Sequence, residues 1–158
     1  MTLDGEKHMD LILWRHADAE FGAADMNRKL TKKGIKQAKD MANWLKPRIP
    51  KPWRLISSPA DRAKETARAL SNMMDIESEI APGSDYLTLL AVANWPESEV
   101  TTIVVAHQPT IGDAAAYLMG SKERGWSVRK SAVLWFSYRV RFKTEQVVLR
   151  AVMNPDLL

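Results

Sequence analysis

The segment Leu11–Glu20, LILWRHADAE, joins four apolar residues to an adjacent arginine and histidine and then to acidic residues. The apolar run is typical of a buried strand, and Arg15 would be costly to bury after it without an anionic partner. In open α/β sheets the ligand lies beyond the carboxyl ends of the strands. We therefore interpret Arg15 and His16 as residues at the ligand-binding edge of a sheet.

Apolar runs alternate with helical periodicities along most of the chain, an order that favours a parallel sheet. The run TTIVVAH (101–107) is the most β-branched and is expected to be the central strand. The other expected strands are 11–14, 53–59 and a short edge strand at 76–80, and the expected helices lie within 30–48, 60–74, 85–95 and 109–120.

Two of the expected helices have recognisable starts. Thr31 is the predicted N-cap of the first, and Ser58 followed by Pro59 is the predicted start of the second. The residues predicted to share the buried face of the first helix are Ile35, Ala38, Ala42 and Leu45.

The end of the chain changes character, since 131–142 and 146–153 flank KTEQ (143–146) like an antiparallel hairpin. Arg139 and Arg141 are expected on its outward face. The predicted fold class is α/β, a three-layer α/β/α sandwich with a mostly parallel central sheet. We expect a polar N-terminal extension over 1–8 and a single domain over 9–158.

Composition limits the classes of function. With 158 residues, of which 46% are hydrophobic, the chain suits one globular core. The net charge of +4 favours anions, but basic and acidic residues are interspersed, so no nucleic acid is expected as a partner. The sequence has no cysteine, no export signal and no uncharged stretch of about 20 residues. It therefore predicts a cytoplasmic protein without a membrane partner.

Polar residues follow three of the predicted parallel strands. They are Arg15 and His16, Ser57 and Ser58 with Arg62 one turn later, and His107. Alone, each has an ordinary explanation: a histidine at a strand end is more often structural, and an arginine on a helix is usually solvated. Together they indicate one pocket for a phosphate or carboxylate, because Arg62 also lies at a helix N-terminus. His8 precedes the strand in a polar region and is given no role.

Three segments resemble the signatures of the histidine phosphatase superfamily: LWRHADA (13–19), LISSPADRAKET (55–66) and VVAHQPTIG (104–112). Ala17 replaces the glycine that usually follows the Arg-His pair, which alters the conformational freedom of the loop. The short chain and NRKLTKKG (27–34) resemble SixA-type phosphohistidine phosphatases more than the larger phosphoglycerate mutases. The resemblance implies a phosphoglycerate mutase-like fold.

By this resemblance His16 is the nucleophile of a metal-independent phosphatase and forms a transient phosphohistidine, with no cofactor. Arg15, Arg62 and His107 are expected to hold the phosphoryl oxygens. Arg28 is either a fourth phosphate ligand or a surface basic residue. The first choice for the general acid is Glu79, in a segment where the superfamily places an acid. The second is Asp18, which could instead orient the loop.

The expected substrate is phosphohistidine of a protein, for example a histidine phosphotransfer domain. The reason is space, because only about 25 residues separate the Arg62 helix from the central strand, which leaves little chain for a lid. A small phosphorylated metabolite as substrate and a phosphate-binding module without catalysis remain alternatives.

A 2-His-1-carboxylate iron site formed by His16, Asp18 and His107 is a third alternative. It is disfavoured because strands alternate with helices here, unlike in the jelly rolls of iron oxygenases, and because it gives Arg15 no task.

Overall fold

The computed structural model describes residues 7–22 and 24–158. Its centre is a six-stranded sheet of order β3-β2-β4-β1-β5-β6. The strands are β1 (His8–Arg15), β2 (Trp53–Ser57), β3 (Asp75–Ile76), β4 (Thr101–Ala106), β5 (Val133–Arg141) and β6 (Thr144–Met153). The α-helices are α1 (Lys32–Leu45), α2 (Asp61–Arg68), α3 (Tyr86–Val92) and α4 (Thr110–Leu118), and the 3-10 helices are η1 (Asp25–Asn27), η2 (Ser78–Ile80) and η3 (Pro155–Leu157).

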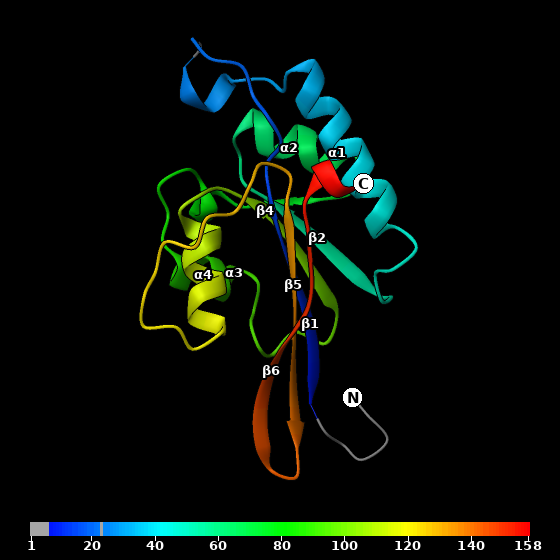
Figure 1. The fold of residues 1–158 in the computed structure, drawn as a ribbon, viewed down its shortest axis with the longest axis vertical. Helices are drawn as coiled ribbons and strands as arrows, with labels where there is room; N and C mark the ends of the chain where they lie inside the picture. The colour runs from blue at the N-terminus through cyan, green and yellow to red at the C-terminus, as the bar shows by residue number, and fades with distance from the viewer. Residues whose placement is uncertain (1–6, 23) are drawn as a thin grey trace.

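Helices cover both faces of the sheet, so the predicted three-layer α/β/α sandwich is confirmed (Figure 1). On one face, Leu11 and Leu13 of β1 pack in one apolar cluster with residues of α3 and α4. On the other face, Ile12 and Trp14 pack with residues of α1 and α2. This alternation along β1 explains why the strand reads as a continuous apolar run.

The sheet is mostly parallel, and β4 lies inside it between β1 and β2 as predicted. Arg15 is in register with Ala106 on β4, and Ser57 is in register with Val105. The residues that follow these strands are His16, Ser58 and His107, and they consequently leave the sheet at the same edge.

Helix α1 has the predicted N-cap, since the Gly34 N–H donates to Thr31 Oγ1. Its predicted buried face is only partly right. Ala38, Ala42 and Leu45 are buried, but Ile35 is 55% exposed. Gly34 and Met41 lie on the buried face instead, because α1 approaches the β1–η1 loop so closely that only a glycine fits at its first turn.

The start predicted for α2 is wrong by two residues. Ala60 is its N-cap, and the Ser58 hydroxyl accepts the Ala60 N–H instead of a helical one. The helix ends at Arg68 rather than near residue 74, because the following residues are needed to bring β3 beside Ile56 of β2. β3 is the predicted edge strand, but it has two residues, and η2 replaces the rest.

The C-terminal hairpin of β5 and β6 is antiparallel, as predicted. Its turn is not KTEQ but the two residues Phe142 and Lys143, whose φ angles of 50° and 61° are left-handed. Such turns usually carry glycine or asparagine, so nothing in the sequence indicated this position.

The predicted polar extension over 1–8 lies largely outside the described residues, and β1 already begins at His8. Within residues 7–22 and 24–158, no helix has both the length and the apolar character needed to cross a membrane.

Candidate active site

His16 lies directly after β1, where its backbone N–H donates to the Ala106 carbonyl of β4. The side chain is buried, at 6% exposure. Its Nδ1 is 2.8 Å from the Ala17 carbonyl oxygen, which can only accept, so Nδ1 carries the proton. Nε2 is therefore the unprotonated nitrogen, and its lone pair accepts a hydrogen bond from the Arg62 Nε–H over 3.4 Å.

The environment keeps the His16 imidazole neutral. Burial lowers its pKa to about 4, and the positive charges of Arg62 and Arg15 act in the same direction. Near pH 7 the ring is an unprotonated base with an available nitrogen. This is the state that a nucleophilic histidine requires.

His107 follows β4 in the same way, and its ring centroid lies 5.2 Å from that of His16. Its Nε2 is 2.7 Å from Ser58 Oγ, which already accepts the Ala60 N–H. We assign the Ser58 hydroxyl as the donor to Nε2, and this assignment places the proton of the neutral His107 ring on Nδ1. Nδ1 is buried and has no hydrogen-bond partner among the described residues, which leaves a donor available to a ligand.

Burial, together with the neighbouring His16 and Arg62, lowers the pKa of His107 to about 3. Both histidines are consequently neutral at physiological pH. Any positive charge for an anion must come from the arginines.

Arg62 lies in the first turn of α2, and its side chain is almost completely buried. Its Nη1 donates to the backbone carbonyl of Asp25 over 2.6 Å, and Nη2 lies 3.3 Å from the Asp25 carboxylate. The carbonyl holds the guanidinium in place beside His16. The sequence predicts that Arg62 and His16 lie in one pocket, and the two side chains are neighbours in the structure.

Arg15 belongs to the last position of β1 and donates from Nη1 to the Val128 carbonyl over 2.7 Å. Its Nε is buried and, within the described part of the chain, has no hydrogen-bond partner. Arg15 also lowers the pKa values of both histidines, which places its charge within electrostatic reach of them. The site thus has two arginines that are fixed from outside by backbone carbonyls.

Ala17, which stands where related sequences usually have glycine, is fully buried. Its N–H donates to Thr66 Oγ1 over 2.9 Å, which attaches the loop after β1 to α2. Its φ is not in the left-handed region that favours glycine. The alanine therefore fits the loop without backbone strain.

Asp25 contacts the arginines of the site, and this was not predicted from the sequence. Its carboxylate lies between two arginines, 3.3 Å from Nη2 of Arg62 and 3.2 Å from Nη1 of Arg28. Burial opposes its ionisation, but the two arginines hold the pKa of Asp25 below its usual value. Asp25 precedes Arg28 by three residues in a polar segment without periodicity, so the only available signal was this spacing.

Arg28 is thereby brought to the site through Asp25 rather than by direct contact with a histidine. Its Nε donates to the Glu20 carbonyl over 2.7 Å. Its charge also contributes to the lowered pKa of His16. The proximity agrees with the role of a phosphate ligand, which stays a prediction.

The two predicted acids occupy different surroundings. Both carboxylate oxygens of Asp18 are engaged, one by Lys130 and one by Thr31, each over 2.7 Å. These bonds lower the pKa of Asp18, so it is ionised at neutral pH and suits the alternative role of orienting the loop. Glu79 is exposed on η2 and makes no hydrogen bond or ion pair with any described residue.

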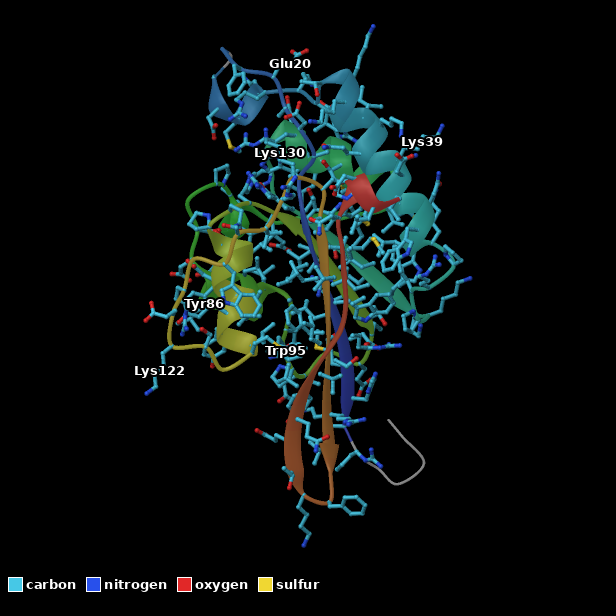
Figure 2. The ribbon with its side chains drawn as sticks, in the orientation of Figure 1. Glu20, Lys39, Tyr86, Trp95, Lys122 and Lys130 are labelled. Atoms are coloured by element: carbon cyan, nitrogen blue, oxygen red, sulfur yellow. The ribbon has the colours of Figure 1, made fainter. Side chains whose placement is uncertain are left out.

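Residues 119–132 also contribute to the site, although no pattern in the sequence indicated this. Gln108 donates to the Trp126 carbonyl, and a Cβ on Gly112 would lie 2.0 Å from that same carbonyl oxygen. Further along, Ser131 donates its N–H to the Arg15 and His16 carbonyls. Figure 2 marks Lys130 at the upper end of the sheet, in the region of the view that also holds α2.

The alternative iron site is not supported by the arrangement. The carboxylate of Asp18 is bound to Lys130 and Thr31 rather than directed toward His16 and His107. Across the ranges 7–22 and 24–158, no group of three such side chains is placed to hold a metal ion. The parallel sheet also differs from the jelly roll expected for that chemistry.

Comparisons with known proteins identify related histidine phosphatases. The family model of the histidine phosphatase superfamily (branch 1) matches residues 11–84. The phosphohistidine phosphatase SixA of Escherichia coli is 31% identical over 121 residues, which cover 70% of this chain and 74% of that protein. The SixA homolog of Haemophilus influenzae is 31% identical over 134 residues, covering 72% and 79%.

A comparison with solved structures also finds a SixA protein. The structure of the protein histidine phosphatase SixA complexed with tungstate has a TM-score of 0.75 and 27% identity, covering 94% of this chain and 99% of that one. The fold, the three sequence signatures and these relatives agree. The chain therefore belongs to the histidine phosphatase superfamily (branch 1) and is a histidine-type phosphatase.

Proposed function

We propose that this protein removes the phosphoryl group from phosphohistidine of another protein, with His16 as the nucleophile. The observation that carries the proposal is the neutral, buried His16, whose unprotonated Nε2 accepts a hydrogen bond from the Arg62 guanidinium. The SixA relatives, which are named phosphohistidine phosphatases, support the choice of substrate.

In the first step, Nε2 of His16 attacks the phosphorus in line with the bond to the leaving imidazole. One N–P bond forms while the other breaks, and the leaving imidazole takes up a proton. Because the bonds formed and broken are of the same type, this transfer needs little thermodynamic driving force. The negative charge on the equatorial oxygens is balanced by Arg62 and Arg15, and His107 Nδ1–H donates a further hydrogen bond.

In the second step, water attacks the phosphorus of phosphorylated His16. The N–P bond breaks, inorganic phosphate leaves, and Nε2 regains its lone pair. The Ala17 carbonyl keeps the Nδ1 proton in place throughout, which holds the ring in the reactive tautomer. No metal ion takes part in either step.

Cleavage of phosphohistidine depends only weakly on a general acid. The ring of phosphohistidine can be protonated near neutral pH before the N–P bond breaks, so that a neutral imidazole leaves, whereas an ester oxygen must receive its proton as the P–O bond breaks. We assign the role to Glu79, whose exposed side chain is free of competing ion pairs with described residues, and assign the orienting role to Asp18. A Glu79→Gln variant is therefore expected to lose less activity on phosphohistidine than on a phosphomonoester.

The path of the chain supports a protein substrate. The segment between α2 and β4 is anchored to the core, since Ile80 of η2 and Leu89 and Leu90 of α3 are buried against the sheet. Little of this segment is left to form a cover over the site. An uncovered site admits a histidine that projects from a partner such as a histidine phosphotransfer domain.

The test compares kcat/KM on a phosphohistidine-bearing protein with kcat/KM on a panel of small phosphomonoesters. We expect the phosphoprotein to be preferred. A small metabolite that is hydrolysed far more efficiently would replace this proposal with a metabolite phosphatase. Phosphate binding without turnover of any substrate would replace it with a binding module. A cytoplasmic location also belongs to the proposal, and cell fractionation tests it.

A further inference from the structure

A second cluster of cations lies at the opposite end of β1. The pocket there has a volume of about 340 Å³ and is lined by Lys7, His8, Ser137, Arg139, Arg141, Val148 and Arg150. At about 3.3 Å per residue, His8 lies roughly 25 Å from the His16 end of the strand. The pocket is therefore separate from the active site.

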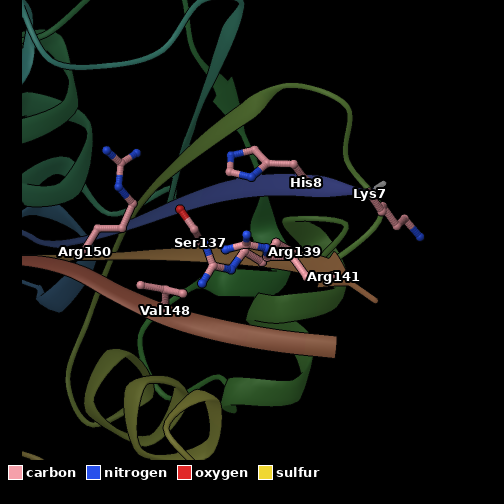
Figure 3. Close-up of a pocket in the computed structure, with 7 residues that line it drawn as sticks. All are labelled: Lys7, His8, Ser137, Arg139, Arg141, Val148 and Arg150. Atoms are coloured by element: carbon pink, nitrogen blue, oxygen red, sulfur yellow. The ribbon is translucent and has the colours of Figure 1, made fainter. Parts of the chain in front are cut away.

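The strand register gathers these side chains on one face of the sheet. Ser137, Arg139 and Arg141 alternate along β5 and consequently point to the same side. In Figure 3 the side chains of Arg139 and Arg141 lie beside each other over β5, with Val148 on β6 below them. Figure 3 also shows Lys7 directed away from this group, and Lys7 forms an ion pair with Glu97.

The carboxylate of Asp10, at the base of the pocket, is fully engaged by neighbouring side chains. Asp10 is buried and accepts hydrogen bonds from Ser137 and Trp135, while His8 and Arg150 contact the same carboxylate. Asp10 thus balances part of the charge of Arg150. It makes no ion pair with Arg139 or Arg141.

Among residues 7–22 and 24–158, Arg139 and Arg141 have no acidic partner across the strands. Arg139 is in register with His8 on one side and Gln146 on the other, and its Nε donates to Gln146 Oε1. Arg141 is in register with Thr144 and stacks its guanidinium near the Phe142 ring. Among the residues that the structure describes, neither guanidinium forms an ion pair, although like charges so close together repel each other.

We propose that this pocket is a binding site for a small phosphorylated molecule with at least two negative charges, held by Arg139 and Arg141. Two planar guanidinium groups on one strand face match the oxygens of a phosphate or diphosphate, and the Ser137 hydroxyl lines the same pocket. The limited volume of the pocket, about 340 Å³, favours a small phosphorylated molecule over a nucleic-acid strand. This inference does not depend on the proposed function.

Two indole groups report on the two sites separately. The Trp135 Nε1–H donates to Asp10 beneath the pocket, and the Arg150 guanidinium lies 5.0 Å from its ring centroid. The Trp14 Nε1–H donates to Ser131, beside Arg15 and His16. The experiment titrates ¹⁵N-labelled full-length protein with pyrophosphate at constant ionic strength and follows both indole resonances.

We expect the Trp135 resonance to shift and saturate with a curve of its own. Arg139→Gln/Arg141→Gln should weaken that curve at least about 10-fold and leave the Trp14 curve within about 2-fold. If the first variant folds poorly, Arg139→Lys/Arg141→Lys replaces it. This variant keeps the charge and should give an intermediate loss of affinity. The matched control Arg48→Gln/Arg68→Gln, which removes two exposed arginines outside both sites, should leave both curves unchanged.

Equal Trp135 curves in the wild-type protein and the Arg139→Gln/Arg141→Gln variant would overturn the proposal, as would a Trp135 resonance that never saturates. A single-stranded oligonucleotide that binds this pocket over 10-fold more tightly than pyrophosphate would also overturn it. That result would identify a nucleic-acid surface instead.

Discussion

The two ends of β1 each gather arginines, yet they hold them differently. At the carboxyl end, Arg62 is 5% exposed and is fixed by the Asp25 carbonyl, and Arg15 is fixed by the Val128 carbonyl. At the amino end, Arg141 is exposed and no backbone carbonyl of a described residue fixes its guanidinium. Donors that are fixed before the reaction stabilise a transition state, whereas mobile donors serve binding.

The largest effect is expected from removing the nucleophile. His16→Ala should reduce kcat/KM by at least about 10³-fold, because no other side chain can form the phosphorylated intermediate. The labelled phosphoenzyme, which should be stable in alkali and labile in acid, should also disappear, and a chelator should not change wild-type activity. Turnover that persists in a folded His16→Ala protein would contradict the assignment.

The next variant compares the two ends directly. Arg62→Lys should lower kcat/KM by about 10²-fold, since an ammonium cannot make the planar two-donor contact. Arg139→Lys, the matched change at the amino end, should leave kcat/KM within about 2-fold. Similar losses in the two variants would show that the difference in burial between the two arginines has no functional meaning.

The order of strands and helices could be predicted from apolar patterning, because each strand and each helix face packs against a neighbour. Arg15, His16, Arg62 and His107 could be found because they follow strand or cap signals within three recognisable segments. Ile35 was wrongly placed because helical periodicity does not reveal how closely α1 approaches the loop at Asp18.

Other parts of the site had no local signal. Ser58 looked like an N-cap, but its hydroxyl serves His107, a contact between residues 49 positions apart. Asp25 and Val128 contribute through contacts with Arg62 and Arg15 that only the folded chain brings together. Such long-range contacts between irregular segments leave no periodicity in the sequence.

Close packing behind the active site should appear as stability. A Cβ on Gly34 would lie 2.0 Å from the Asp18 carbonyl oxygen, so Gly34→Ala should cost about 1–3 kcal/mol in the free energy of unfolding and should also reduce activity. Gly83→Ala, at a left-handed position with open space, is the matched control and should cost about 1 kcal/mol without affecting activity. Chemical denaturation and kcat/KM measured on both variants check this prediction.

Acidification should destabilise the carboxyl end in particular. The pKa values of His16 and His107 are about 4 and about 3 in the folded protein, below the usual 6.5. Between pH 6.5 and 4 the unfolded chain binds protons at both rings that the folded chain does not. As the pH is lowered through this range, the free energy of unfolding should therefore decrease, by at most about 1.4 kcal/mol per pH unit for each histidine. Denaturation at several pH values should show a smaller slope for His16→Asn.

The smallest expected effect tests whether the fixed arginines are partly neutralised by the protein itself. The Asp25 carboxylate lies near both Arg62 and Arg28, so it competes with an incoming anion for their charge. Asp25→Asn keeps the backbone carbonyl that holds Arg62 Nη1, and it should tighten tungstate binding by about 3- to 10-fold. Titration followed by the Trp14 indole resonance measures this affinity. Asp156→Asn, which removes one negative charge from η3 in the same way, should leave this affinity unchanged.

If Asp25→Asn instead weakens tungstate binding, the carboxylate positions the arginines more than it neutralises them. In that case the carboxyl end would depend on its acid in the way that Arg150 at the amino end is paired with Asp10.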